Sequence, residues 1–211
     1  FYVLRPDDGL GRGFFMEHVN GEALGQRIVR HEAFAAVRPA LAHQCGAILA
    51  RIHQLTRPGA LPVTPVAAIL DALERQHRLE DWPRPVFELA LRWLREHAPT
   101  DVEPRVVHGD FRTGNLLIAE DGVRAVLDWE LAHAGDPAED LGWICVNSWR
   151  FGAIDKPVGG FGAREDLYAA YEAAGGGRVD RQRAHFWEVL GTLRWGVICT
   201  MSGVALREGS A

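Results

Sequence analysis

The stretch VVHGDFRTGNLLIAEDGVRAVLDWE, residues 106–130, contains two short apolar runs that both end in charged residues. The first run leads into His108, Gly109 and Asp110, and the second ends at Asp128 and Glu130. A carboxylate at the end of a strand is costly to place in a core unless it has a partner or a ligand. This stretch therefore predicts a functional site carried on a small β patch.

The order of side chains in the same stretch indicates metal-assisted phosphoryl transfer. Asp110 directly follows a predicted strand, where its carboxylate could accept a proton from a substrate hydroxyl. Asn115 comes five residues later, and Asp128 ends the returning strand beside it. An amide oxygen, a carboxylate and phosphate oxygens together form the partly open oxygen shell that Mg²⁺ prefers. The protein-kinase template uses the same parts at the same spacing between the base and the amide.

The rest of the chain predicts helices around this patch. Apolar residues recur at three- and four-residue steps from Val37 to Leu55, which is typical of a long amphipathic helix. Before it, the runs FYVLR and GFFMEHV predict a hairpin. Further helices are expected at 69–79, 87–97, 137–149, 164–174 and 186–206, and strands at 105–107, 116–118 and 124–127. The expected fold class is α+β, mainly α, with a small β patch at 105–128.

Composition limits the kind of protein this can be. The chain has 211 residues, 47% hydrophobic and 24% charged, with a net charge of -5, so it can bury a sizeable core but offers no field for nucleic acid. No apolar stretch approaches the length of a membrane span. Cys45, Cys145 and Cys199 lie in apolar segments and are expected to be buried, free thiols in a reducing cytoplasm. The oligomeric state is not indicated.

HGDFRTGN, followed thirteen residues after its Asn by the Asp of LDWELAHAGDPAEDLG, resembles the aminoglycoside phosphotransferase family of small-molecule kinases, which have a protein-kinase-like fold. The resemblance implies that the chain is the large, C-terminal lobe of an enzyme that transfers the terminal phosphoryl group of ATP or GTP to a small-molecule hydroxyl. It also implies that Asp110 is the catalytic base, that Asn115 and Asp128 bind Mg²⁺, and that Leu117 lies beneath the purine.

The segment GFFMEHVNGEAL resembles the strand and hinge between the two lobes of that family. The resemblance makes residues 1–20 a residual small-lobe hairpin and hinge, and residues 21–211 the helical large lobe. It places the purine edge against the backbone of Met16, Glu17, His18 and Val19.

Kinase-like folds hold the nucleotide phosphates with a small-lobe lysine, but the single lysine here, Lys156, follows Asp128 in the sequence. Two interpretations remain open: a fragment that is inactive alone, or a non-catalytic nucleotide-binding relative.

The remaining polar residues of this region have supporting roles in the sequence interpretation. His108 is expected to shape the loop through a hydrogen bond, and Asp136 and Asp140 to cap the helix that starts there while supporting the site. Glu130 would share one side of an extended segment with the preceding Asp and could reach metal or substrate. Arg112 would contact substrate or lie at the surface. The seven tryptophans fall in apolar company and are expected in the core.

Two further hypotheses concern chemistry and acceptor. A metal-dependent hydrolase could use His108, Asp110, Asp128 and Glu130, although it would explain neither Asn115 nor the hinge-like segment. Residues 65–105, where the resembled family binds much of its acceptor, carry nearly balanced acidic and basic residues among aromatic ones. A polycationic aminoglycoside needs a cleft dominated by carboxylates. A neutral or anionic acceptor with an apolar portion is therefore expected instead.

Overall fold

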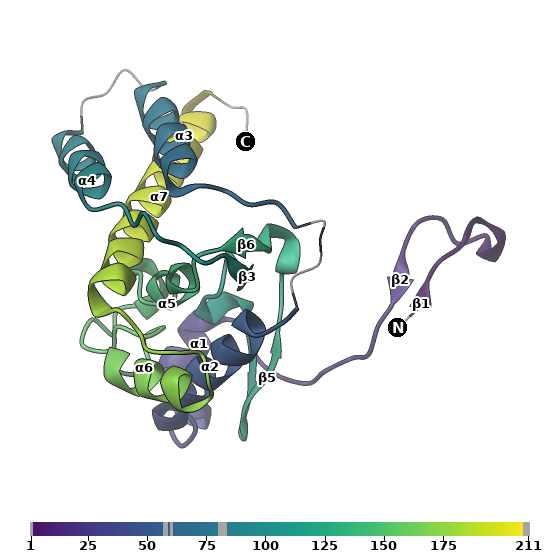
Figure 1. Ribbon diagram of the computed structural model, residues 1–211. Helices are drawn as coiled ribbons and strands as arrows, with labels where there is room; N and C mark the ends of the chain where they lie inside the picture. The colour runs from purple at the N-terminus through teal and green to yellow at the C-terminus, as the bar shows by residue number, and fades with distance from the viewer. Residues whose placement is uncertain (1, 57–58, 60, 80–83, 209–211) are drawn as a thin grey trace.

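The structure is a computed structural model that describes residues 2–56, 59, 61–79 and 84–208 (Figure 1). Its strands are β1 Tyr2–Val3, β2 Phe14–Phe15, β3 Arg105–Val107, β4 Leu116–Ala119, β5 Gly122–Val126 and β6 His133–Gly135. Its α-helices are α1 Gly25–Arg30, α2 Arg38–His53, α3 Val66–Arg78, α4 Pro85–Glu96, α5 Ala138–Trp143, α6 Arg164–Ala173 and α7 Arg181–Glu208. Short 3₁₀ turns are η1 Pro6–Asp8, η2 Glu32–Phe34, η3 Thr113–Asn115, η4 Trp129–Leu131 and η5 Asn147–Arg150.

The N-terminal hairpin stands apart from the helical body, joined to it by an extended segment (Figure 1). β1 and β2 pair antiparallel, with Tyr2 opposite Phe15 and Val3 opposite Phe14. Both phenylalanines are 60% exposed, so most of the surface of their side chains faces outward. The hairpin confirms the expected pattern, but its second strand ends at Phe15 and does not continue to residue 19.

The lower part of the body is built on the packing of α2 against α6 (Figure 1). The expected apolar stripe of α2 is confirmed: Leu41, Cys45 and Leu49 are fully buried. The two helices approach most closely at Gly46, where a Cβ would lie 2.2 Å from a backbone carbonyl oxygen of α6. Leu55 was expected on the same stripe, but α2 ends at His53 and Leu55 is 53% exposed.

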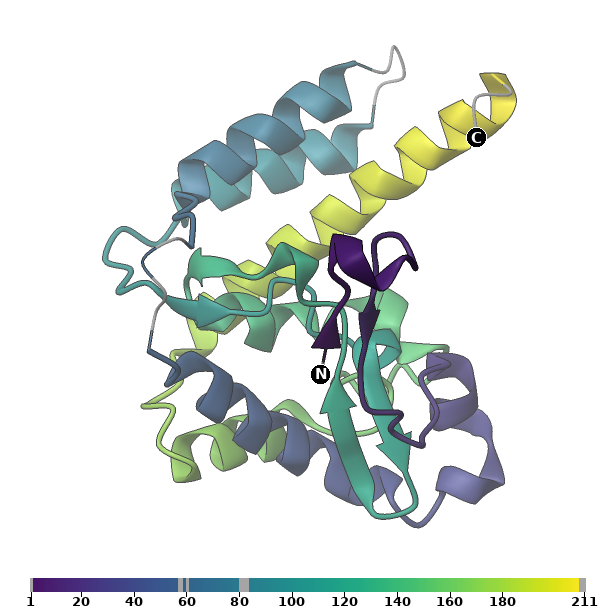
Figure 2. The same ribbon diagram turned by 90° about the vertical axis from the view of Figure 1, so that its right-hand side faces the viewer.

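The upper part is a helical layer in which α3 and α4 pack on the long α7 (Figure 2). Its separate core contains leucines of α3 and α4 together with aromatic and aliphatic residues of α7: Leu70, Leu73, Leu91, Leu94, Phe186, Leu190, Leu193 and Val197. α5 also packs on α7, so this one helix connects the upper layer to the β patch. The helices expected at 69–79, 87–97, 164–174 and 186–206 are confirmed with small shifts of their ends.

The β patch consists of two separate antiparallel pairs. β4 and β5 form a hairpin in which Leu116 lies opposite Val126, around the expected turn at Asp121 and Gly122. β3 pairs instead with β6, with Val106 opposite Ala134. The sequence did not predict β6, because three residues with no alternation of apolar and polar side chains carry no strand signal. The patch therefore extends to residue 135, beyond the expected limit of 128.

Three further expectations are corrected. The helix expected over 137–149 ends at Trp143, because Val146 has an extended ψ of 137° and the 3₁₀ turn η5 follows it. α1 was not predicted. Cys45 and Cys145 are buried as expected, whereas Cys199 is exposed on α7. No helix in the described ranges is long and apolar enough to cross a bilayer.

Candidate active site

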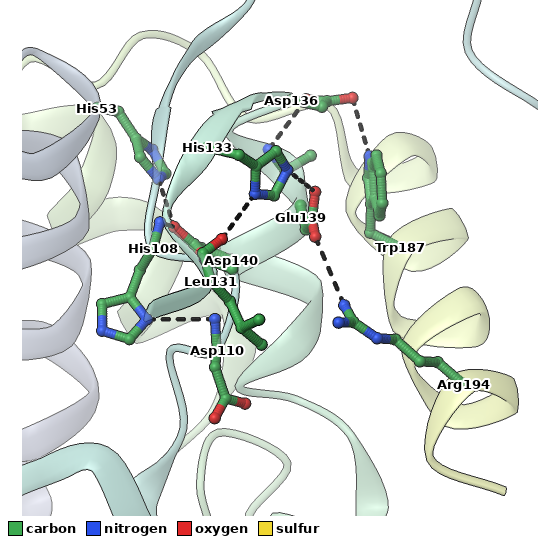
Figure 3. A network of polar contacts seen from close by, with 12 residues as sticks. His53, His108, Asp110, Leu131, His133, Asp136, Glu139, Asp140, Trp187 and Arg194 are labelled. Atoms are coloured by element: carbon green, nitrogen blue, oxygen red, sulfur yellow. Dashed lines mark hydrogen bonds and ion pairs between the residues drawn. The ribbon is translucent and has the colours of Figure 1, made fainter. Parts of the chain in front are cut away.

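The backbone of the loop after β3 is held by a buried carboxylate, Asp140 of α5. Its Oδ2 accepts a hydrogen bond from the backbone N–H of His108 at 2.8 Å, and its Oδ1 accepts one from the N–H of Gly109 at 2.9 Å. The Nε2 atom of His53, on α2, lies 3.1 Å from the same Oδ2 (Figure 3). The sequence predicted that Asp140 would cap the helix that starts there. Its two oxygens instead accept from the loop amides, so Asp140 fixes the loop that precedes the candidate base.

The environment of Asp140 favours its ionised form. Burial alone would raise the pKa of this carboxyl, but the hydrogen bond with His53 and those from the two loop amides hold the pKa below its ordinary value. The loop is also tight at Gly109, which has a φ of 78°, and a Cβ there would lie 2.5 Å from the carbonyl oxygen of Leu131. Only glycine fits this backbone without strain.

His108 uses both ring nitrogens inside the protein. Its Nε2 lies 2.9 Å from the carbonyl oxygen of Leu127, and its Nδ1 lies 3.2 Å from the backbone nitrogen of Asp110. Because the Asp110 amide can only donate, Nδ1 is the acceptor and Nε2 carries the proton. The ring therefore connects the loop to the end of β5 and has no nitrogen left to bind a metal.

The carboxylate of Asp110 is half-buried and receives hydrogen bonds from three side chains. Trp143 of α5 donates through Nε1 to Oδ1 at 2.7 Å, and Asn115 donates through Nδ2 to Oδ2 at 2.7 Å. Nε of Arg112 lies 3.2 Å from both oxygens, and its guanidinium stacks on Trp149 at 4.9 Å. Short, charge-assisted bonds of this kind fix the orientation of a carboxylate. The Arg112 contact is the longest of the three.

The role of Trp143 was missed at the sequence level. A tryptophan in an apolar helix indicates core packing, and Trp143 is indeed buried. Its indole N–H nevertheless points to the carboxylate of Asp110. A buried indole N–H usually finds a partner, and that rule is the only sequence signal that could have suggested a polar role.

Asn115 and Asp128 are brought together by the β4–β5 hairpin. The backbone N–H of Leu127 donates to the carbonyl oxygen of Asn115 at 2.8 Å, so Asp128 follows directly beside it. Asn115 donates its amide N–H to Asp110, which leaves its amide oxygen available, and Asp128 is exposed. An amide oxygen and a carboxylate fit Mg²⁺ if phosphate oxygens and water complete its shell. Among the described residues, no group of three or more His, Cys, Asp or Glu could hold a metal alone.

Glu130 does not share the side of Asp128, contrary to the expectation from an extended segment. Asp128 has a left-handed backbone, with φ of 65°, and the 3₁₀ turn Trp129–Leu131 follows it. The chain therefore bends after Asp128 and does not continue as an extended segment. Within this turn, Trp129 packs against the ring of His108 with 4.7 Å between the centroids. Glu130 is exposed and lines a cavity beside the loop.

The hinge-like residues 16–19 lie in the extended segment that joins the hairpin to the body. Just after them, Glu22 and Ile118 of β4 exchange two backbone hydrogen bonds, at 2.8 and 2.9 Å. A Cβ on Gly21 would lie 2.7 Å from the side chain of Leu117. The connection therefore runs along β4, next to the leucine that was expected beneath the purine.

A cavity of about 460 Å³ opens beside the loop that follows β3, between α3, residues 130–133 and α7. Ala68, Ile69 and Leu73 of α3 form an apolar wall, and Gly109 and Glu130 lie on the side of the loop. Polar groups of α5, β6 and α7 complete the lining. The cavity directly adjoins the residue that precedes Asp110.

Three charged residues that the sequence did not single out meet at this cavity: His133, Glu139 and Arg194 (Figure 3). Nδ1 of His133 lies 2.9 Å from the carbonyl oxygen of Leu131, and its Nε2 lies 3.3 Å from Oε2 of Glu139. The contact with Glu139 raises the pKa of His133, while burial raises the pKa of Glu139. No spacing motif connects these residues, so only the structure could identify them.

Asp136 joins the start of α5 to α7. Its Oδ1 accepts from the backbone N–H of Ala138 at 3.0 Å, as expected of a capping residue. Its Oδ2 accepts from Nε1 of Trp187 at 2.9 Å (Figure 3). The same oxygen accepts from Nε of Arg183 at 2.5 Å. These bonds hold α7 in a fixed position relative to the start of α5, which packs on the loop that follows β3.

Comparison with known proteins gives one family match that covers most of the chain. The sequence model described as the phosphotransferase enzyme family matches residues 3–185. Among curated proteins, the acyl-CoA dehydrogenase family member 10 of Mus musculus is 42% identical over 64 residues, which are 29% of this chain and 6% of that protein. The homoserine kinase of Methylocella silvestris is 35% identical over 82 residues, 36% of this chain and 25% of that protein.

Among solved structures, a candidate aminoglycoside phosphotransferase from Ralstonia eutropha superimposes with a TM-score of 0.73 at 23% identity. The match covers 94% of this chain and 65% of that one. The chain thus spans less than two thirds of the length of these proteins, and the structural likeness concerns the fold.

Proposed function

The chain belongs to the phosphotransferase enzyme family, and on that premise we propose that it transfers the terminal phosphoryl group of ATP, or of GTP, to a hydroxyl of a small molecule with the help of Mg²⁺. The observation that carries this proposal is the orientation of Asp110. Its carboxylate is held by Trp143 and Asn115 at 2.7 Å each, in a loop fixed by a buried, ionised Asp140. A base held in this way is positioned to receive a proton from an attacking hydroxyl.

The chemical step follows from these contacts. The acceptor hydroxyl displaces the long Arg112 contact, donates to a carboxylate oxygen of Asp110, and attacks the terminal phosphorus. The proton passes to Asp110 as the new P–O bond forms, and the bond to the leaving nucleoside diphosphate breaks. Arg112 remains close enough to pair with phosphate oxygens.

We propose that the amide oxygen of Asn115 and the carboxylate of Asp128 would hold Mg²⁺ together with the nucleotide phosphates and water. When bound, the ion would neutralise the charge that gathers on the phosphate oxygens in the transition state. The hard oxygen donors at these two positions support this assignment. Glu130 points to a different part of the site and belongs to the acceptor side of the proposal.

The nucleotide is proposed to bind along the connection at residues 16–19, with Leu117 beneath the purine. The separation of the hairpin from the body supports a lobe boundary near residue 20 (Figure 1). The acceptor is proposed to bind in the 460 Å³ cavity between α3 and α7, which adjoins Gly109. The apolar wall of that cavity supports an acceptor with an apolar portion rather than an aminoglycoside.

Two other functions make different predictions. A metal-dependent hydrolase is disfavoured, because both ring nitrogens of His108 are engaged within the protein. A nucleotide-binding module without activity would explain why the single lysine, Lys156, lies exposed between η5 and α6, far from the hairpin in sequence. An Asp110 carboxylate oriented by two short hydrogen bonds would have no role in a module that only binds a nucleotide.

A ³¹P NMR experiment on the full polypeptide distinguishes these functions. The protein is incubated with Mg²⁺ and ATP, alone and with a panel of small hydroxylated acceptors. The proposal predicts a new phosphate-ester resonance that depends on an acceptor. Release of inorganic phosphate at the same rate without any acceptor would indicate a hydrolase, and nucleotide binding without turnover would indicate a binding module.

A further inference from the structure

The position of Arg194 on α7 requires an explanation that the chemistry at Asp110 does not provide. Its guanidinium lines the acceptor cavity and lies 5.3 Å from the ring centre of Trp143, the same indole that donates to Asp110. A guanidinium over the face of an indole is attracted by the quadrupole of the ring. The N–H groups at the edge of the guanidinium then remain free to donate hydrogen bonds. Arg194 is therefore placed one indole away from the candidate base.

The positive charge of Arg194 has no close carboxylate partner within the described part of the protein. Its nearest carboxylate oxygen is Oε1 of Glu139 at 3.9 Å, beyond hydrogen-bond distance, and no hydrogen bond from the guanidinium is found among the described residues. Its side chain is 30% exposed and so remains open to the cavity.

Glu139 is not an adequate partner for Arg194, because it is already paired with His133. The Nε2 atom of His133 approaches Glu139 to 3.3 Å, closer than Arg194 does. The pKa of His133 is raised chiefly by this contact, which shows that the imidazole and the Glu139 carboxylate act on each other directly. The oxygen that faces His133, Oε2, is buried and accepts no hydrogen bond from any described residue, so Glu139 is held at the cavity by these two ion-pair distances alone.

We propose that Arg194 binds an anionic group of the acceptor, so that the acceptor is a hydroxy acid whose carboxylate pairs with Arg194 while its hydroxyl meets Asp110. This inference rests on the proposed phosphotransferase function. The planar fork of a guanidinium matches a carboxylate with two parallel hydrogen bonds.

The cavity also constrains the rest of the acceptor. Ala68, Ile69 and Leu73 provide an apolar wall along α3, which suits the methylene groups between the hydroxyl and the carboxylate. Arg194 and Asp110 contact the same indole from different atoms, so the two ends of the acceptor are separated by a spacer of a few carbon atoms. In an acceptor of that kind the hydroxyl can contact Asp110 while the carboxylate contacts Arg194, so no charge is buried without a partner.

The test compares each acid with its uncharged amide. Transfer from ATP is measured for hydroxy acids from 3-hydroxybutyrate to 6-hydroxyhexanoate and for the matching primary amides, with the full polypeptide and its Arg194→Gln and Arg194→Lys variants. The proposal predicts that the best acid is preferred over its amide, and that Arg194→Gln lowers kcat/KM for the acid by about 10- to 100-fold, mainly through KM. Transfer to the amide should change by less than about threefold, and Arg194→Lys should retain part of the preference.

The matched control is Arg75→Gln, which removes an exposed arginine of α3 that does not line the cavity. It should leave the preference for the acid unchanged. If Arg194 only neutralised Glu139, Arg194→Gln would reduce transfer to acid and amide alike. That result, or an acid preference that survives Arg194→Gln, overturns the inference while leaving the phosphotransferase function intact.

A binding measurement separates the two levels of the proposal. Saturation-transfer NMR with the same acids detects their binding in the absence of turnover. If no acceptor is phosphorylated but the acids bind in an Arg194-dependent manner, the anion site stands and the proposed function fails. If the acids neither bind nor react, the anion site is refuted as well.

Discussion

Replacing Asp140 by Asn should destabilise the protein by loosening the loop that follows β3. The carboxylate is fully buried and accepts from the amides of His108 and Gly109, with His53 as a third partner. An amide at this position keeps one acceptor oxygen but turns its NH₂ toward a donor, so at least one backbone N–H loses its partner. Hydrogen bonds to charged groups are worth about 1.5–3 kcal/mol each, and a buried unsatisfied donor costs about 1–3 kcal/mol. The expected loss of unfolding free energy is therefore about 2–5 kcal/mol.

Urea unfolding followed by circular dichroism measures this loss. With a urea dependence of about 2 kcal/mol per molar, the midpoint should fall by roughly 1–2.5 M. The matched control is Asp155→Asn, an exposed carboxylate with no hydrogen bond or ion pair among the described residues, which should change stability by no more than about 0.5 kcal/mol. Equal midpoints for the two variants would refute the assignment of Asp140 as the support of the loop.

Three other predictions test separate parts of the account. Trp143→Phe removes the 2.7 Å bond to Asp110 and should lower kcat about tenfold or more with little change in the nucleotide KM, as steady-state kinetics would reveal. Because the pKa of His133 is raised in the folded protein, the stability it contributes is complete below about pH 6.5 and is lost as pH rises through the raised value. Urea midpoints across pH 6–9 should therefore fall less steeply for His133→Gln than for the unaltered chain. Gly46→Ala should lower the unfolding free energy by about 1–3 kcal/mol in the same assay, since its Cβ would meet a carbonyl of α6 at 2.2 Å; an unchanged midpoint would show that the helices separate without cost.

The helices were largely predictable because their apolar periodicity coincides with their packing. The stripe from Val37 on α2 is an example, since its leucines fill the core with α6. Prediction failed where tertiary contacts decide the backbone. The helix at 137–149 stops at Trp143, and β6 exists only because β3 needs a partner. Neither outcome is encoded in local propensity.

The candidate site shows the same division. Asp110, Asn115 and Asp128 were singled out from their spacing, and the structure brings them together because the loop and hairpin that join them are local in sequence. Trp143 and Arg194 were not found, because their positions depend on how α5 and α7 pack on that loop. The position of Glu130 relative to Asp128 was not predictable, because the left-handed backbone of Asp128 and the 3₁₀ turn after it replace the extended segment that the sequence suggested.

The most direct test of the central claim compares Asp110→Asn with Asp155→Asn in the full polypeptide. Transfer of label from [γ-³²P]ATP into the small-molecule fraction is measured alongside the dissociation constant of the nucleotide. The account predicts that Asp110→Asn lowers transfer by roughly 10²–10⁴-fold, with nucleotide affinity changed by less than about threefold, while Asp155→Asn behaves as the unaltered chain. Near-normal transfer by Asp110→Asn would contradict the assignment of Asp110 as the base.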